Sequence, residues 1–287
     1  MIYRLLAMNI DGTILQSNGK LHKSVKDAVE YVQSKGVTVT LVTSRNFVFA
    51  KRIAKALKLQ SMIIAHHGSF IASTSDQALF VKRIDEQIVY DIVRLLESYP
   101  CHIRIVHERY SISNVPIKQN IVSRAIIDMN SFSSYHHQFV ENISSYVEEE
   151  QIHPTHIEVV FHNSSVANEV KTALQNMYYE VDLQLYGNQL IILPNSVSKL
   201  TGLLYTCEKW KIPLNQVVAI GSDLDDLDII DAVGLGVAMG NAPLEVKDKA
   251  DWITRSNNEH GVSYMVREHF RKQQPIGLID KINSTKK

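Results

Sequence analysis

Residues 2–13 have the sequence IYRLLAMNIDGT, an apolar run that ends in polar residues and glycine. The run at 2–8 predicts a buried strand, and Asp11-Gly12 predicts the turn that follows it. Strands that alternate with helices across short loops predict a parallel sheet with helices on its faces. The first third of the chain continues in this way, with a helix expected at 22–35, a strand at 37–42, a helix at 47–58 and a strand at 61–65.

The last third of the chain resumes this alternation. From about residue 278 the sequence predicts a tail that frays. Upstream of it, strands are expected at 188–193, 216–221 and 235–239, and helices at 198–210, 224–231 and 243–249.

The middle of the chain has a different pattern, because strands and helices no longer alternate regularly. Helices are expected at 86–98 and 165–177, and strands at 102–107 and 156–162. This pattern predicts a separate α+β unit inserted into the first domain. We therefore predict an α/β fold in which a Rossmann-like parallel-sheet core, residues 1–82 plus 191–287, carries an inserted α+β cap domain at 83–190.

Composition limits the classes of protein that this chain can be. Its 287 residues suggest about two domains. Thirty basic residues balance thirty acidic ones, so no charge favours nucleic acid or an anionic membrane as a partner. No apolar run is long enough to span a membrane, and the start lacks the features of a signal peptide. With only Cys101 and Cys207, the chain fits a reducing compartment, and we expect a cytoplasmic protein.

Polar residues follow each predicted core strand. Asn9 to Thr13 follow the first strand, Thr43 and Ser44 the second, and Gly221 to Asp226 a later one, while Lys199 opens a helix. Ligands bind at the carboxyl ends of strands in such sheets. Carboxylates suit Mg²⁺, and lysine and hydroxyl donors suit phosphate oxygens. The sequence thus predicts a site for a metal and a phosphoryl group.

These motifs resemble those of the haloacid dehalogenase superfamily, in its Cof-like branch of phosphatases with an inserted cap. The family motif D-x-D-G-T is matched by NIDGT at 9–13, and G-D-x-x-N-D by GSDLDD at 221–226. Thr43 and Lys199 match the second and third motifs. The tail AMGNA at 238–242 also fits, so the resemblance covers nearly the whole chain.

The resemblance implies aspartyl-phosphate catalysis with Mg²⁺. Position 9 is the nucleophile, and Asp11 is the acid and base. The resemblance assigns phosphate binding to Ile10, Thr43, Ser44, Lys199 and Asp225. It assigns the metal shell to Asn9, Asp11, Ser222, Asp223 and Asp226. An alternative is that Thr43 and Ser44 are ordinary helix caps. The adjacent pair His66-His67 is expected at the surface or at the hinge near the cap, and not as a metal site.

Three positions depart from the family pattern. Asn9 is neutral and cannot form the usual phosphoenzyme, and losing a nucleophile costs on the order of 10⁶ in kcat in another hydrolase class. Ser222 stands where a metal-binding Asp is expected, although a shift of the loop by one residue would let Asp223 replace it. Asp225 replaces an Asn, and its charge should repel a phosphate ~4 Å away by about 4 kcal/mol at an effective dielectric of ~20.

Three hypotheses follow. The favoured one is a phosphatase-like protein with a degenerate site, weak or no phosphomonoester hydrolysis, and the capacity to bind a small phosphorylated metabolite. The second is an active Mg²⁺-dependent phosphatase of such metabolites, with Asp223 or Asp11 taking over the metal duties. The third is a non-catalytic scaffold for a protein partner that the sequence does not identify.

Overall fold

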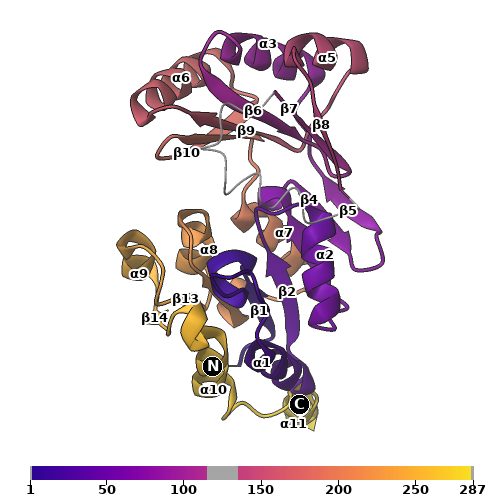
Figure 1. Ribbon diagram of the computed structural model, residues 1–287. Helices are drawn as coiled ribbons and strands as arrows, with labels where there is room; N and C mark the ends of the chain where they lie inside the picture. Colours follow the sequence, from indigo (N-terminus) through magenta and orange to yellow (C-terminus); the bar gives the residue numbers. More distant parts are fainter. Residues whose placement is uncertain (1, 115–134, 286–287) are drawn as a thin grey trace. The chain divides into compact units, whose positions relative to one another are not determined.

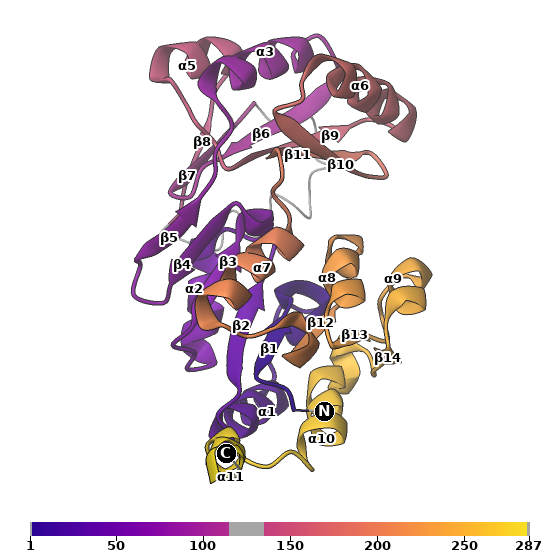
Figure 2. The same ribbon diagram turned by 180° about the vertical axis from the view of Figure 1, so that it is seen from behind.

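The computed structural model describes residues 2–114 and 135–285 and divides into two compact units. The core unit comprises Met1–Leu79 and Lys199–Lys287, and the cap unit comprises Phe80–Ser198. Figure 1 and, from behind, Figure 2 show that each unit has its own sheet and its own helices.

The core unit is built on an eight-stranded sheet whose centre is parallel. Its strand order is β14-β13-β12-β1-β2-β3-β4-β5. The chain moves outward from β1 through β2 and β3, then returns on the other side of β1 with β12, β13 and β14. The strands are β1 (Leu5–Met8), β2 (Thr38–Val42), β3 (Met62–Ala65), β4 (Phe70–Ser73), β5 (Ala78–Val81), β12 (Val217–Gly221), β13 (Leu235–Ala238) and β14 (Trp252–Ile253). This topology confirms the predicted α/β fold class with a parallel-sheet core.

Helices cover the sheet and bury apolar side chains against it. In α1 these side chains form a stripe of Val25, Ala28, Val29 and Val32, the spacing that the sequence predicts. Helix α1 packs against α10, and α7 packs against α8. The core helices are α1 (Lys23–Ser34), α2 (Phe47–Ala56), α7 (Lys199–Trp210), α8 (Leu227–Ala232), α9 (Leu244–Lys249), α10 (Gly261–Phe270) and α11 (Ile276–Thr285).

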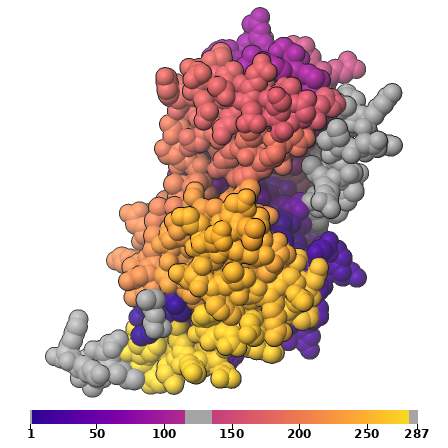
Figure 3. Space-filling model, turned by 90° about the vertical axis from the view of Figure 1, so that its left-hand side faces the viewer, coloured from indigo at the N-terminus to yellow at the C-terminus, as the bar shows by residue number. Residues whose placement is uncertain are grey.

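Helix α11 replaces the fraying tail that the sequence predicted. The amide of Ile276 donates to the carbonyl of Lys35, and Asp280 forms an ion pair with Arg4. These contacts to the end of α1 and the start of β1 supply the ordering that the local sequence lacks. In Figure 3 the C-terminal segments, coloured orange to yellow, form much of the surface of the core unit that faces the viewer.

The cap unit has a six-stranded sheet in the order β10-β11-β9-β6-β7-β8. Its apolar face packs against the three helices through side chains such as Ile103, Val159 and Leu190. The strands are β6 (Cys101–Val106), β7 (Tyr110–Ser113), β8 (His136–Phe139), β9 (His156–Phe161), β10 (Val181–Tyr186) and β11 (Gln189–Pro194), and the helices are α3 (Glu86–Leu96), α5 (Ile143–Glu150) and α6 (Ser164–Met177).

The two boundaries of the cap unit differ from the predicted 83 and 190. Strand β11 pairs antiparallel with β10 and β9, so the residues from 191 to 194 belong to the cap sheet and not to the core. The sequence of β11 is as apolar as that of a core strand, so composition alone does not distinguish the two sheets. The compact cap unit extends to Ser198, and Lys199 is the first residue of the returning core.

No helix within residues 2–114 and 135–285 is long and apolar enough to cross a membrane. Cys101 and Cys207 are both free and buried. Burial raises the pKa of the Cys207 thiol to about 11, so this thiol is protonated near neutral pH. It is therefore a packing residue and not a reactive one.

Candidate functional site

The candidate site lies where the central strands of the core end. Asn9, Thr43 and Ser222 directly follow β1, β2 and β12. Because β1 pairs in parallel with both β2 and β12, these three residues lie at the same edge of the sheet. This is also the point at which the strand order reverses, where open α/β sheets bind their ligands.

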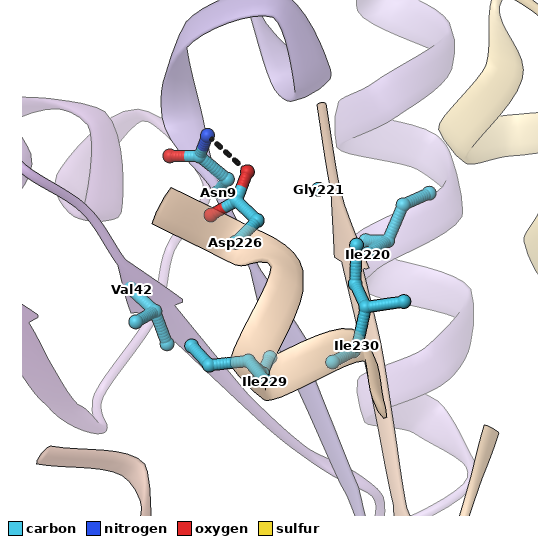
Figure 4. A pocket seen from close by; sticks show the side chains of 9 residues that line it. Asn9, Val42, Ile220, Gly221, Asp226, Ile229 and Ile230 are labelled. Atoms are coloured by element: carbon cyan, nitrogen blue, oxygen red, sulfur yellow. Dashed lines mark hydrogen bonds between the residues drawn. The ribbon is translucent and has the colours of Figure 1, made fainter. Parts of the chain in front are cut away.

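Asn9 and Asp226 meet at the centre of this edge. Figure 4 shows their side chains pointing toward each other above apolar residues that include Val42 and Ile229. The Asn9 amide nitrogen Nδ2 donates to Asp226 Oδ2 at 2.8 Å, and Asn9 Oδ1 accepts from the backbone amide of Ile10 at 2.7 Å. Asn9 and Asp226 are both buried. The amide of Asn9 therefore presents a proton donor, and not an oxygen, to the carboxylate.

Both oxygens of Asp226 are occupied by donors. Oδ2 accepts from the backbone amides of Ser222 at 2.9 Å and Asp223 at 3.1 Å, in addition to Asn9. Oδ1 accepts from Lys199 Nζ at 2.7 Å. Burial raises the pKa of Asp226, and the charge of Lys199 opposes that shift. Position 221 has room only for glycine, because a Cβ there would lie 2.5 Å from Asp226 Cγ.

Lys199 is buried between two carboxylates. Its Nζ lies 2.8 Å from Asp225 Oδ1 and 2.7 Å from Asp226 Oδ1. Burial alone would lower the pKa of Lys199, but the charges of Asp225 and Asp226 outweigh it and raise the pKa above its usual value. The cation that the resemblance assigns to phosphate is thus already neutralised by two internal partners.

Both members of the histidine pair near the end of β3 are buried, with His66 fully enclosed and His67 exposed by only 5%. His66 Nε2 accepts from the amide of Phe47 at 3.1 Å, which fixes the start of α2. His67 Nδ1 lies 3.6 Å from Asp225 Oδ2. The predicted surface position is therefore wrong, because the turn after β3 is covered by α7, whereas the alternative of a role at the hinge near the cap stays a prediction. Gly202 of that helix approaches Gly68 so closely that a Cβ would lie 3.2 Å from its Cα.

Asp11 is held by Arg45. The guanidinium donates from Nε to Asp11 Oδ2 and from Nη2 to Asp11 Oδ1, each at 2.8 Å. The side chains are 34% and 28% exposed, so this pair faces solvent while Lys199 and Asp226 do not. Sequence reasoning assigned no role to Arg45. Its position, two residues after Thr43 at the end of a core strand, was the signal that could have found it.

Ser222 connects the first and fourth motifs. Its Oγ donates to the backbone carbonyl of Asp11 at 3.0 Å and accepts from Thr13 Oγ1 at 3.2 Å. The carbonyl of Asp11 also accepts from Asn9 Nδ2 at 3.3 Å. Gly12 has φ of +62°, and a Cβ there would lie 2.5 Å from Ser222 Oγ. The loop after β1 and the loop after β12 are therefore in direct contact.

Asp223 caps the turn of Leu224–Asp226. Its side chain accepts from the backbone amide of Asp226, and the Asp226 side chain accepts from the amide of Asp223 in return. Desolvation, followed by the charges of Asp226 and Asp225, raises the pKa of Asp223 to about 6. Oxygens of Asp223, Asp225 and Asp226 lie within 4.8 Å of one another, so these residues form an acidic cluster around Lys199.

The remaining predicted residues line the same edge. Thr43 is fully buried, and its Oγ1 accepts from the amide of Arg45 at 3.1 Å. The N-cap of α2 is Asn46, so the alternative that Thr43 and Ser44 are helix caps is wrong. Ile10 is buried and its amide is satisfied by Asn9. Ser44 is half-buried and takes no part in the hydrogen bonds described above.

Comparison with known proteins decides the family. A family model described as haloacid dehalogenase-like hydrolase matches residues 6–266. The chain belongs to the haloacid dehalogenase-like hydrolases. The resemblance to the Cof-like branch of this superfamily is thereby confirmed.

Relatives of this hydrolase family align over the full chain. "Stress response protein YhaX" of Bacillus subtilis is 44% identical over 285 residues, which cover 99% of both chains. "Phosphatase YwpJ" of the same organism is 24% identical, covering 92% of this chain and 99% of its own. A solved haloacid dehalogenase-like hydrolase of B. subtilis has a TM-score of 0.81 at 21% identity, covering 93% of this chain and 99% of its own. That structural likeness shows the fold.

Magnesium is typical of haloacid dehalogenase-like hydrolases, and the residues present do not fit a magnesium site of that type. The family places ligands at position 9, at the carbonyl of residue 11 and at position 222. Here an amide nitrogen and a hydroxyl both donate to the Asp11 carbonyl. Mg²⁺ requires oxygen ligands, and one or two carboxylates usually supply them. The acidic cluster beside this position already contains an internal cation, Lys199.

Proposed function

We propose that this chain is a phosphatase-like member of its family with weak or no phosphomonoester hydrolysis. The observation that carries the proposal is the hydrogen bond from the Asn9 amide to Asp226, at the position of the family nucleophile. A neutral amide is a poor nucleophile, so the aspartyl-phosphate intermediate has no residue on which to form.

The hydrogen-bond network around Asn9 also bears on metal binding, and it supports the same proposal. Asn9 Nδ2 and Ser222 Oγ place protons against the Asp11 carbonyl, and Lys199 supplies the positive charge beside Asp226. The polar groups in this part of the site are hydrogen-bonded by protein groups alone. We infer that it stays folded and ordered in the absence of any metal.

We propose in addition that the site retains the capacity to bind a small phosphorylated metabolite on its outer side. Arg45 is the cation that meets the ligand, because its side chain is 28% exposed while that of Lys199 is 2% exposed. The phosphoryl group would displace Asp11 from the guanidinium, which binds phosphate and carboxylate in the same bidentate way. The carboxylate of Asp225 opposes entry of the phosphoryl group deeper into the site, because it is negatively charged and already occupies Lys199.

A phosphatase assay tests the main proposal. The natural protein, Asn9→Asp and the double variant Asn9→Asp, Ser222→Asp are compared on an aryl phosphate with and without Mg²⁺. We expect no Mg²⁺-dependent turnover by the natural protein and measurable turnover by the double variant, because it restores both carboxylates. Asn168→Asp adds the same charge at an exposed position of α6 and should leave the natural protein silent.

The opposite outcome supports the second hypothesis, an active Mg²⁺-dependent phosphatase. In that case the natural protein hydrolyses the aryl phosphate, and Asp11→Ala abolishes the activity. The assignment of Asn9 as a non-nucleophilic residue would then be wrong.

A further inference from the structure

One edge of the cap sheet is suited to pairing with another strand. Strand β10 ends the strand order, and β11 is its one partner among the strands of residues 2–114 and 135–285. Figure 1 and Figure 2 show β10 at the border of the cap sheet. The other edge strands are shorter: β14 has two residues, and β5 and β8 have four each, whereas β10 has six. Short edge strands resist pairing with another chain, so β10 is the edge best able to accept one.

The backbone of β10 presents every second residue to this edge. The carbonyl of Glu180 accepts from the amide of Asn195, just past the end of β11, at 2.8 Å. Residues of an antiparallel pair alternate between those that bond to the partner strand and those that do not, so positions 180, 182, 184 and 186 bond to β11. The N–H and C=O groups of the other series point to the edge, and among the described residues they have no main-chain partner. That series consists of Val181, Leu183 and Leu185.

The side chains of β10 divide in the same way. Val181 is buried in the apolar cluster of the cap unit, and Leu183 and Leu185 are half-buried against it. The strand contains no lysine, arginine or proline, the residues that commonly protect an edge strand from pairing. Its one charged side chain is Asp182, on the opposite face, whose Oδ2 accepts from the amide of Ser196 at 2.6 Å. The edge therefore carries little that opposes a second strand.

A second copy of β10 complements this edge when the two strands run antiparallel about a twofold axis at Leu183. Opposed residues then share a face of the sheet, with Leu183 facing its equivalent and Val181 of one copy facing Leu185 of the other. Each of these three pairs joins backbone groups that point outward, which gives about six main-chain hydrogen bonds. Asp182 stands opposite Gln184 of the other copy, so no like charges meet.

Exposed apolar side chains lie at the start of the same edge. Met177 is 55% exposed and Tyr179 is 80% exposed. In the pairing described above, position 179 stands opposite Gly187 of the other copy, in the turn between β10 and β11. A Cβ at Gly187 would meet no atom within 4 Å, so this turn leaves open space for the tyrosine ring. Covering the ring would add to the free energy of association.

We propose that β10 pairs antiparallel with β10 of a second copy of this chain, about a twofold axis at Leu183, so that two cap sheets form one continuous sheet. This inference concerns the cap unit alone and does not depend on the function proposed for the site in the core unit. One pair of edge strands buries less surface than a standard interface of about 1,600 Å², so we expect a dimer that dissociates in the micromolar range.

Sedimentation velocity of the full chain, from about 1 to 200 µM, tests the proposal through charge at position 184. Gln184→Glu places a carboxylate opposite Asp182 of the other copy and should weaken the dimer about three- to tenfold. Gln184→Lys places the opposite charge there and should tighten the dimer by a similar factor. Both changes lie on the face of the sheet away from the apolar cluster. Gln60→Glu adds the same charge at an exposed position of the core unit and should leave the dimer unchanged.

Hydrogen exchange of the natural protein locates the interface. The amides of Val181, Leu183 and Leu185 should exchange more slowly as the protein concentration rises, while those of β8, at the other end of the cap sheet, should not change. A chain that stays monomeric overturns the proposal and leaves this edge to a strand of a different protein. A dimer that responds to neither charge at position 184 also overturns it. Weakening by both charges overturns the twofold axis at Leu183, because it places Gln184 opposite itself.

Discussion

The inner and outer halves of the site after β1 use charge in different ways. In the inner half, Lys199 and Asp226 are buried, in contact with each other, and fixed by further hydrogen bonds. In the outer half, Asp11 and Arg45 form an equally well aligned pair that is about one third exposed. Burial makes the inner pair expensive to break, whereas water competes with the outer pair. The inner half is thus part of the fold, and the outer half is the part that can exchange partners.

The largest expected effect is on stability, from Lys199→Met. This change leaves two neighbouring buried carboxylates without their cation, and breaking a buried pair in this way costs about 3–5 kcal/mol. Denaturant unfolding at pH 7 measures it. Lys209→Met removes the same charge from an exposed position of the same helix and should change the free energy of unfolding by about 0.5 kcal/mol or less. Equal losses for the two variants would contradict the distinction between the halves.

The second effect comes from Asn9→Asp in the absence of metal. The new carboxylate would face Asp226 across the present 2.8 Å contact and lose its donor, at a cost of about 1–3 kcal/mol. Like charges and burial raise the pKa of a carboxyl, so the folded variant binds a proton that the unfolded chain releases. The loss of stability should therefore grow as pH rises from 5 to 8. A loss that is constant with pH would indicate that no carboxylate pair has formed.

A smaller effect is expected in the outer half, from Arg45→Gln. Exposed ion pairs contribute about 0–1 kcal/mol, so the free energy of unfolding should fall by no more than that. A double-mutant cycle with Asp11→Asn isolates the coupling between the two side chains. Coupling as large as the cost of Lys199→Met would show that the outer pair is structural after all.

The smallest effect concerns Asp223, whose pKa is raised to about 6. A carboxyl with a folded pKa above its unfolded value favours the protonated folded state, so its contribution to stability is lost as pH rises from about 4 to 6. Asp223→Asn removes this titration. In thermal unfolding between pH 4 and 7, the melting temperature of the variant should therefore rise relative to that of the natural protein as pH rises. Parallel curves would mean that Asp223 has an ordinary pKa.

The sequence was informative about the core because local pattern and tertiary fold agree there. The stripe of α1 and the polar residues that end β1, β2 and β12 follow from periodicity and from the rule for strand ends. It was misleading at β11, whose apolar run suits either sheet, since pairing partners and not composition decide the sheet to which a strand belongs. It also missed α11, which is ordered by distant contacts of Ile276 and Asp280.

The candidate site was also predictable from the sequence only in part. Substitutions at Asn9 and Ser222 were visible in the motifs, but their hydrogen bonds were not, because residues from separate loops make them. The bidentate hold of Arg45 on Asp11 required the geometry of two strand ends. Burial of His66 and His67 depends on α7 covering a turn that lies well over a hundred residues earlier in the chain.

The position of β1 in the sheet has a consequence for folding. Leu5 of β1 pairs with Val217 of β12, and the whole cap unit lies between them in the chain. During synthesis at about 5–20 residues per second, β12 follows β1 by roughly 10–40 s. For that interval the nascent core has β1 as an open edge, and open edges pair with other strands. We expect the chain to fold slowly from denaturant and to aggregate when truncated before β12, since its central strand pairing is so distant in sequence.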